Sequence, residues 1–163
     1  MSASPKPPLP WHHPASLLAT WFGSGLLPKA PGTWGSLAAL PFAWAIAAAT
    51  GPIGLAVAAG AAYLAGLWAS GIYLRRSGDG DPGAVVIDEV AGQWLALIPA
   101  ALDPWLYLVG FLLFRAADIL KPFPANWIDR RLGGAQGVML DDIAAGLYAG
   151  AILYALSKWV LPA

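Results

Sequence analysis

The chain has 163 residues, of which 58% are hydrophobic and only 11% charged; its formal net charge is zero and it contains no cysteine. Ordinary soluble domains have about a quarter charged residues, so this composition favours a membrane protein over an alanine-rich soluble helical bundle. The balanced charge argues against a nucleic-acid partner, and the lack of cysteine excludes disulfides, thiolate metal sites and a cysteine nucleophile.

The N-terminal segment, residues 1–14, is rich in proline and lacks the basic start and apolar run of a signal peptide. We expect a flexible arm there. The remaining residues, 15–163, are enough for one domain and too few for two. The expected organisation is therefore an arm followed by a single helical domain.

The next segment, residues 23–36, is interrupted so often by glycine and proline that a loop is predicted. Three polar side chains in it, Ser24, Lys29 and Thr33, are candidates for binding a phosphate or a glycerol headgroup. A loop that only packs against the rest of the protein explains these residues equally well.

Residues 53–74 form the clearest apolar run, which carries no charge and ends at two arginines. About twenty helical residues span the hydrocarbon core of a bilayer, so this run is long enough to cross it. The shorter apolar run before it, residues 37–50, is joined to it by Gly51 and Pro52, which are a turn signal. The two runs predict a helical hairpin.

A second hairpin is predicted for residues 90–114, which are apolar except for Asp103. This aspartate precedes a proline, a turn signal, and each half gives only about 15–20 Å of helix. Residues 143–161 predict a last helix. The expected fold class is all-α: a small polytopic helical membrane protein with short helical hairpins and a polar active-site face.

Most of the charged residues lie in two stretches, six within residues 75–89 and eight within residues 115–142. The predicted hairpins place both stretches on one face of the membrane. Since the stretches hold most of the lysines and arginines, this face is predicted to be cytoplasmic.

Three clusters within these stretches have side chains suited to chemistry. In the first, Asp88 and Glu89 are adjacent at the start of an apolar run. Adjacent carboxylates repel each other, and a helix dipole offsets only about 0.3–1 kcal/mol of that repulsion. A divalent cation would offset far more, and oxygen ligands suit Mg²⁺. The alternative, a helix cap, explains one acid better than two.

The second cluster consists of Arg115, Asp118 and Lys121, which are three residues apart and so share one helical face. An ordinary chain of ion pairs along that face is the alternative. Because this helix emerges from an apolar segment, where charged residues are expensive, a functional role is favoured.

The third cluster combines Arg130 and Arg131, a glycine-rich stretch at residues 133–137, and the pair Asp141 and Asp142. Glycine-rich loops can bring backbone N–H groups close to a phosphate. The acid pair precedes the last predicted helix as the first acid pair precedes an earlier one. Two such pairs on one face could hold one or two Mg²⁺ ions.

Together these clusters resemble the phosphatidylglycerophosphatase A family. The matching stretches, in the family's order, are GSGLLPKAPGTWGS, DPGAVVIDEVAGQW and FRAADILKPFPANWIDRRLGGAQGVMLDDIAAG. The resemblance implies a Mg²⁺-dependent phosphatase that converts phosphatidylglycerophosphate into phosphatidylglycerol and inorganic phosphate. It also implies a phospholipid partner and a location in the bacterial inner membrane, and it leaves the oligomeric state open.

The roles of the site residues follow from the acidic and basic positions of that family. The resemblance implies a metal site formed by Asp81, Asp88, Glu89, Asp141 and Asp142. It implies catalytic roles for Asp88, Glu89, Asp118, Asp141 and Asp142. The implied substrate-binding residues are Lys29, Arg115, Lys121, Asp129 and Arg130, with Ser24 and Thr33 from the loop. The nucleophile is either an aspartate or a water molecule.

Three other kinds of protein fit the pattern less well. CDP-alcohol phosphotransferases also use aspartates and Mg²⁺, but their DG-x-x-AR motif is followed by spaced aspartates, whereas Asp129 is followed here by two adjacent ones. A small transport or channel subunit would carry its acids through the depth of the membrane rather than at segment ends. A non-catalytic relative of the same fold is the last alternative.

Overall fold

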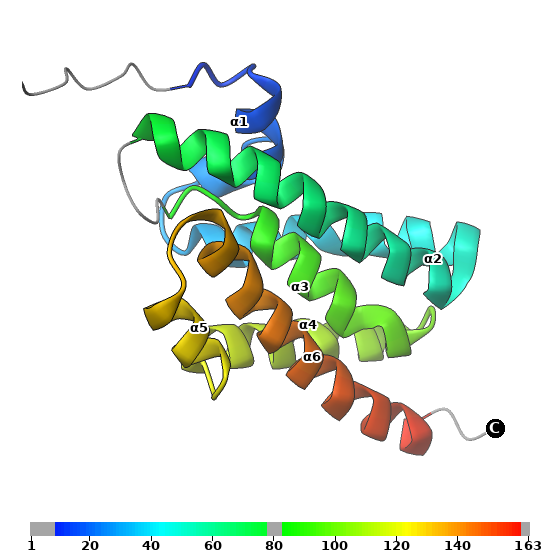
Figure 1. Cartoon of the computed structure of the whole chain (residues 1–163). Coiled ribbons are helices and arrows are strands. Elements are labelled where there is room, and N and C mark those ends of the chain that lie inside the picture. Colours follow the sequence, from blue (N-terminus) through cyan, green and yellow to red (C-terminus); the bar gives the residue numbers. More distant parts are fainter. Residues whose placement is uncertain (1–8, 78–82, 161–163) are drawn as a thin grey trace, which may run out of the picture.

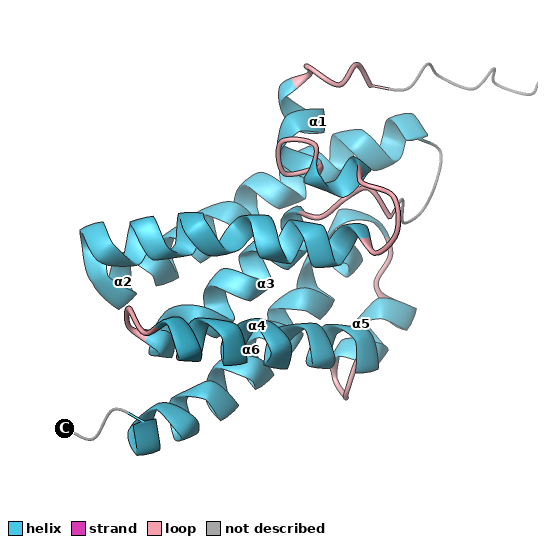
Figure 2. Ribbon diagram, turned by 180° about the vertical axis from the view of Figure 1, so that it is seen from behind, coloured by secondary structure: helices cyan, strands magenta, loops and turns pink. Residues whose placement is uncertain are grey.

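The structure is a computed structural model that describes residues 9–77 and 83–160. In chain order these residues form α1 (Pro14–Ala19), η1 (Ser24–Leu26), α2 (Pro31–Ser77), α3 (Ile87–Leu97), η2 (Ile98–Ala100), α4 (Pro104–Leu120), α5 (Ala125–Arg131) and α6 (Gly134–Val160), where η denotes a 3₁₀ helix. No strand occurs among the described residues (Figure 2), so the predicted all-α class is confirmed.

The longest helix, α2, is a hairpin of two arms. Gly51 has φ 71° and ψ −172°, a conformation that glycine adopts readily because it has no Cβ atom. The chain reverses there, at the cyan turn in Figure 1. Residues 31–50 and 52–77 therefore run in opposite directions, and the predicted hairpin is confirmed.

The second predicted hairpin is also present, and it consists of α3, η2 and α4. Asp103 caps α4, because its side chain accepts a hydrogen bond of 2.9 Å from the backbone N–H of Leu106. Pro104 follows in the first turn, where the missing N–H of proline has no helical partner to lose. This cap returns the chain toward the end of the bundle from which α3 started.

Two segments that were predicted as loops are helical over most of their length. Pro31 begins α2, so the predicted loop at residues 23–36 ends in the first turns of a helix. The helix α6 begins at Gly134, which has φ 67°, rather than at residue 143. Residues 135–142 contain no proline, and their packing outweighs the penalty of about 1 kcal/mol for a glycine within a helix. The second acid pair consequently lies about two turns inside α6.

The helices α3 and α6 lie side by side in Figure 1, and their backbones approach each other closely. A Cβ atom added to Gly146 would lie 2.5 Å from the backbone oxygen of Gly92, and one added to Gly92 would lie 2.5 Å from the backbone oxygen of Asp142. One turn further along, Gly150 faces Ala96. Small residues at four-residue spacing allow such contacts between helices in membranes.

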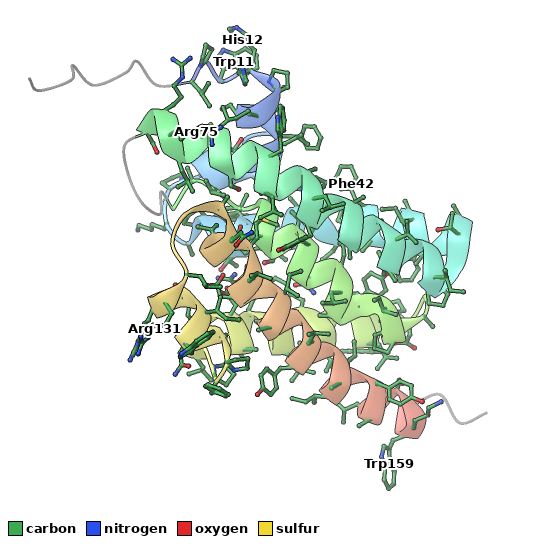
Figure 3. All side chains as sticks on the ribbon, in the orientation of Figure 1. Trp11, His12, Phe42, Arg75, Arg131 and Trp159 are labelled. Carbon is green, nitrogen blue, oxygen red and sulfur yellow. The ribbon has the colours of Figure 1, made fainter. Side chains whose placement is uncertain are left out.

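Two helices, α2 and α6, are long and apolar enough to cross a membrane, judged by length and composition. Large apolar side chains such as Ile53, Val57 and Leu64 are exposed along α2. Arg75 and Arg131 lie at one end of the bundle and Trp159 lies at the other (Figure 3). Exposed apolar side chains along a helix of this length are typical of a protein in a bilayer.

The close helix contact gives a testable prediction about stability. In Gly146→Ala the added methyl group meets the backbone of α3, which cannot rotate away, so we expect a loss of about 1–3 kcal/mol in the free energy of unfolding. The measurement is chemical or thermal unfolding of the purified protein in detergent. The control is Gly60→Ala on α2, where an added Cβ has no neighbour within 4 Å.

For Gly60→Ala we expect no loss, or a gain of up to about 1 kcal/mol from the better helix propensity of alanine. Equal stabilities of the two variants would contradict the proposed backbone contact between α3 and α6.

Candidate active site

A polar cavity of about 470 Å³ opens where the start of α2 and of α3 meets the end of α4, α5 and the start of α6. We call it the acid cavity. Its ionisable lining residues are Asp88, Glu89, Arg115, Asp118, Lys121, Asp129, Asp141 and Asp142. The structure therefore gathers residues from all three sequence clusters into one place.

Three carboxylates converge in the deepest part of this cavity. Asp88 and Glu89 lie in the first turn of α3, and Asp142 lies on the facing side of α6. One oxygen from each of the three side chains lies within 4.8 Å of the other two. Asp88 is only 9% exposed and Asp142 only 3%. Because water reaches these groups poorly, their mutual repulsion is weakly screened.

One side-chain oxygen of each of the three acids also lacks a hydrogen-bond partner. Asp88 Oδ1, Glu89 Oε2 and Asp142 Oδ2 are buried oxygens without a donor. Burial raises the pKa of Asp88 well above its ordinary value, and the neighbouring charge of Glu89 raises it further. Burial likewise raises the pKa of Glu89. The dipole at the start of α3 contributes about 2 kcal/mol at most to one acid, so it cannot offset the burial and mutual repulsion of three acids.

A divalent cation fits this group of acids. The three side chains offer only oxygen ligands, which is the donor set that Mg²⁺ prefers. Their partnerless oxygens point to a positively charged ligand, because buried ionised carboxylates are otherwise paired. The residues that could hold the ion are thus Asp88, Glu89 and Asp142.

Arg115 lies beside the three acids and belongs to α4. Its guanidinium forms an ion pair with Asp118, as their spacing of three residues along the helix predicts. Its Nη1 atom is also 3.9 Å from Glu89 Oε1. A Cβ atom at Gly32, at the start of α2, would collide with that same Glu89 oxygen, so a larger residue there would displace the Glu89 carboxylate. Sequence analysis did not single out Gly32, and its place within a quoted family motif was the only signal for it.

Lys121 forms the opposite wall of the acid cavity. It ends α4 with φ 45°, and its Nζ atom donates to Asp129 Oδ1 at 2.7 Å and to Asp141 Oδ2 at 2.8 Å. Burial lowers the pKa of Lys121, but the two hydrogen bonds outweigh that effect and raise it above its ordinary value. Asp141 is therefore paired with a lysine, whereas its neighbour Asp142 faces the other acids.

The remaining residues of the predicted site lie elsewhere. Ser24 donates a hydrogen bond to Thr20 O and lines a separate apolar cavity beside Trp21. Lys29 and Arg130 are exposed and Thr33 is half-buried; none of the three lines the acid cavity. The predicted ligand Asp81 lies outside the described residues.

The fold and the acid cavity define a class: a small all-α membrane protein whose buried acids and neighbouring cationic groups can bind a cation and a phosphate together. The family model described as phosphatidylglycerophosphatase A matches residues 17–157. The chain belongs to the phosphatidylglycerophosphatase A family, and it is accordingly an enzyme, a phosphatase.

Individual relatives agree with this assignment. The chain is 39% identical over 158 residues to a protein of Escherichia coli (strain K12) named phosphatidylglycerophosphatase A, covering 89% of this chain and 82% of the relative. It is 38% identical over 151 residues to a Haemophilus influenzae protein of the same name, covering 91% and 92%. A Bacteroides thetaiotaomicron protein, provisionally named a phosphatidylinositol-3-phosphatase, is 37% identical over 158 residues, covering 89% and 94%. No solved structure matches the chain.

The raised pKa of Asp88 predicts that this carboxylate destabilises the metal-free protein at neutral pH. A folded-state pKa above the unfolded value means that ionisation costs more in the folded state than in the unfolded state. We therefore expect Asp88→Asn to raise the free energy of unfolding in EDTA by more than the roughly 0.5 kcal/mol that bounds most surface substitutions. Thermal unfolding in detergent at pH 7 measures this change.

The matched control is Asp103→Asn, the same chemical change at the cap of α4, where asparagine caps as well as aspartate. Its stability should stay within about 0.5 kcal/mol of the unsubstituted protein. A loss of stability in Asp88→Asn that is absent from this control would mean that the Asp88 carboxylate is already paired.

Proposed function

We propose that the protein hydrolyses phosphatidylglycerophosphate to phosphatidylglycerol and inorganic phosphate with Mg²⁺ held by Asp88, Glu89 and Asp142. The observation that carries the proposal is the convergence of three carboxylates, each with one buried oxygen that has no hydrogen-bond partner, beside Arg115 and Lys121. The substrate is proposed from the names of the relatives in Escherichia coli and Haemophilus influenzae.

The charge of the acid cavity supports the need for a cation. Its lining holds six carboxylates and two cationic side chains. If all of these groups are ionised, the lining repels a phosphate monoester, which is itself an anion. Arg115 and Lys121 are moreover already paired with acids. A bound Mg²⁺ would supply the missing positive charge and Lewis-acid stabilisation of the phosphoryl group.

The cationic side chains are placed to bind the phosphoryl oxygens. The guanidinium of Arg115 has several donors in a fixed fork, so it can keep its ion pair with Asp118 and still donate to a phosphate. Lys121 has three donors, of which two are used by Asp129 and Asp141. The third is free to donate to the substrate.

Positioning and electrostatic stabilisation carry most of the catalysis of phosphoryl transfer. The protein's contribution is then a rigid frame of α3, α4 and α6 that holds Arg115 and Lys121 next to the acids of the cavity. This frame holds the phosphoryl group in place while the bond between phosphorus and the glycerol oxygen breaks.

The location of the acid cavity suits a lipid substrate. It lies at the basic end of the bundle, where Arg75 and Arg131 are found (Figure 3). By the positive-inside rule this end faces the cytoplasm, and the membrane would be the bacterial inner membrane. The acyl chains can stay in the bilayer beside the apolar helices while the headgroup enters the cavity.

The proposal is tested by phosphate release from phosphatidylglycerophosphate in mixed micelles, with Mg²⁺ or with EDTA. We expect release that requires Mg²⁺ and that falls by about a hundredfold or more in Asp142→Asn, because the substitution removes a charged ligand of the Mg²⁺ that would stabilise the transition state. The control Asp103→Asn should retain the unsubstituted rate.

Two outcomes would contradict parts of this proposal. Release that persists in EDTA would retain the substrate but exclude the metal site. Faster release from phosphatidic acid or from phosphatidylinositol 3-phosphate than from phosphatidylglycerophosphate would reject the proposed substrate.

A further inference from the structure

Gln93 is a buried polar residue that the proposed function does not use, and two of its side-chain atoms lack partners. It lies on α3 and is completely buried. Neither its side-chain nitrogen Nε2 nor its side-chain oxygen Oε1 has a hydrogen-bond partner. A buried polar group without a partner costs about 1–3 kcal/mol, whereas an apolar side chain of the same size would avoid that cost. A functional role for the side-chain amide would explain why position 93 is a glutamine rather than an apolar residue.

The position of Gln93 relates it to Glu89, one helical turn earlier. Residues four apart lie next to each other on a helix surface. Helical side chains also lean toward the N-terminal end, so the side chain of Gln93 leans toward Glu89. The backbone of α3 is anchored in this register, because Trp94 Nε1 donates to Ala39 O of α2 at 3.0 Å.

The partnerless polar atoms of Gln93, Glu89 and Arg115 comprise both donors and acceptors. Glu89 Oε2 is a buried acceptor without a donor, and Gln93 Nε2 is a buried donor without an acceptor. Gln93 Oε1 is a buried acceptor, and Arg115 Nε, whose guanidinium lies beside Glu89, is a donor without an acceptor. Because Glu89 lies one helical turn before Gln93, a rotation of the Gln93 side chain toward it would pair Gln93 Nε2 with Glu89 Oε2.

We propose that Gln93 is a positioning residue whose amide donates a hydrogen bond to Glu89 Oε2 and thereby fixes the direction of the Glu89 carboxylate. The inference rests on the proposed function, because it gives Glu89 the role of a metal ligand. Residues that orient a metal ligand typically change metal affinity by about 10–100-fold when they are replaced. Gln93 touches neither the phosphate nor the ion in this role; it acts through Glu89.

The test replaces the amide and measures metal binding directly. Mn²⁺ is titrated into the purified full-length protein in detergent, and free Mn²⁺ is read from its EPR signal. We expect Gln93→Met, which keeps the length of the side chain, to weaken Mn²⁺ binding about 10–100-fold. Gln93→Asn keeps an amide but shortens its reach by one methylene, so we expect a similar loss.

Two further readouts separate positioning from a structural role. The thermal stability of Gln93→Met in EDTA should equal or exceed that of the unsubstituted protein, because a partnerless amide is removed from the interior. In phosphate-release assays the Mg²⁺ concentration for half-maximal activity should rise, while KM for the lipid at saturating Mg²⁺ should change by no more than about twofold. Gln136→Met, the same change at an exposed position of α6, is the control and should alter none of these values.

The outcomes are decisive in both directions. Unchanged Mn²⁺ affinity in a folded Gln93→Met or Gln93→Asn protein overturns the inference, and so does a failure of both variants to fold, which would make Gln93 structural. Absence of Mn²⁺ binding by the unsubstituted protein overturns the proposed metal site, and the inference with it. The two failures are distinguishable, because a missing metal site shows in the unsubstituted protein, whereas a missing role of Gln93 shows only in the variants.

Discussion

The close contact between α3 and α6 is the constraint on which the site depends. Gly92 and Gly146 let the two backbones touch, and this contact fixes how the preceding turn of each helix is placed. Asp88 and Asp142 lie one turn before those glycines, so they are forced together in a place that water reaches poorly. The packing of the helices thus creates a concentration of negative charge that neither a helix dipole nor a surface ion pair can offset. The divalent cation that we propose would resolve this conflict between packing and electrostatics.

The other helices complete this arrangement rather than create it. The α2 hairpin covers α3 and holds it through Trp94, while Gly32 leaves space for the Glu89 carboxylate. Arg115 comes from α4, which is returned to the acid cavity by the Asp103 cap. The segment after Lys121 is tied to α6 by a hydrogen bond from Tyr148 to Phe123 O. Every cationic group that faces the acids therefore depends on a turn or a helix end, whereas the acids themselves lie on the α3–α6 contact.

The amino-acid sequence was sufficient for the helical class, for both hairpins and for most members of the acid cavity, because proline, glycine and charge are strong local signals. It was insufficient for the start of α6, since a glycine-rich run resembles a loop until tertiary packing outweighs its poor helix propensity.

The sequence also could not separate the roles of Asp141 and Asp142. Adjacent residues on a helix point about 100° apart, so one pairs with Lys121 and the other with the acids of α3. Ser24 and Thr33 looked suitable for a phosphate by residue type alone, and only the fold places them away from the cavity.

The central claim is that Asp88, Glu89 and Asp142 form one cation site. The most direct measurement is an experimental structure of the protein with Mn²⁺ in place of Mg²⁺, in which anomalous scattering locates the ion without reference to the protein. The account predicts an anomalous peak coordinated by oxygens of all three carboxylates, with Lys121 still paired to Asp141. An ion bound elsewhere, or three carboxylates that stay unliganded at saturating Mn²⁺, would contradict the account.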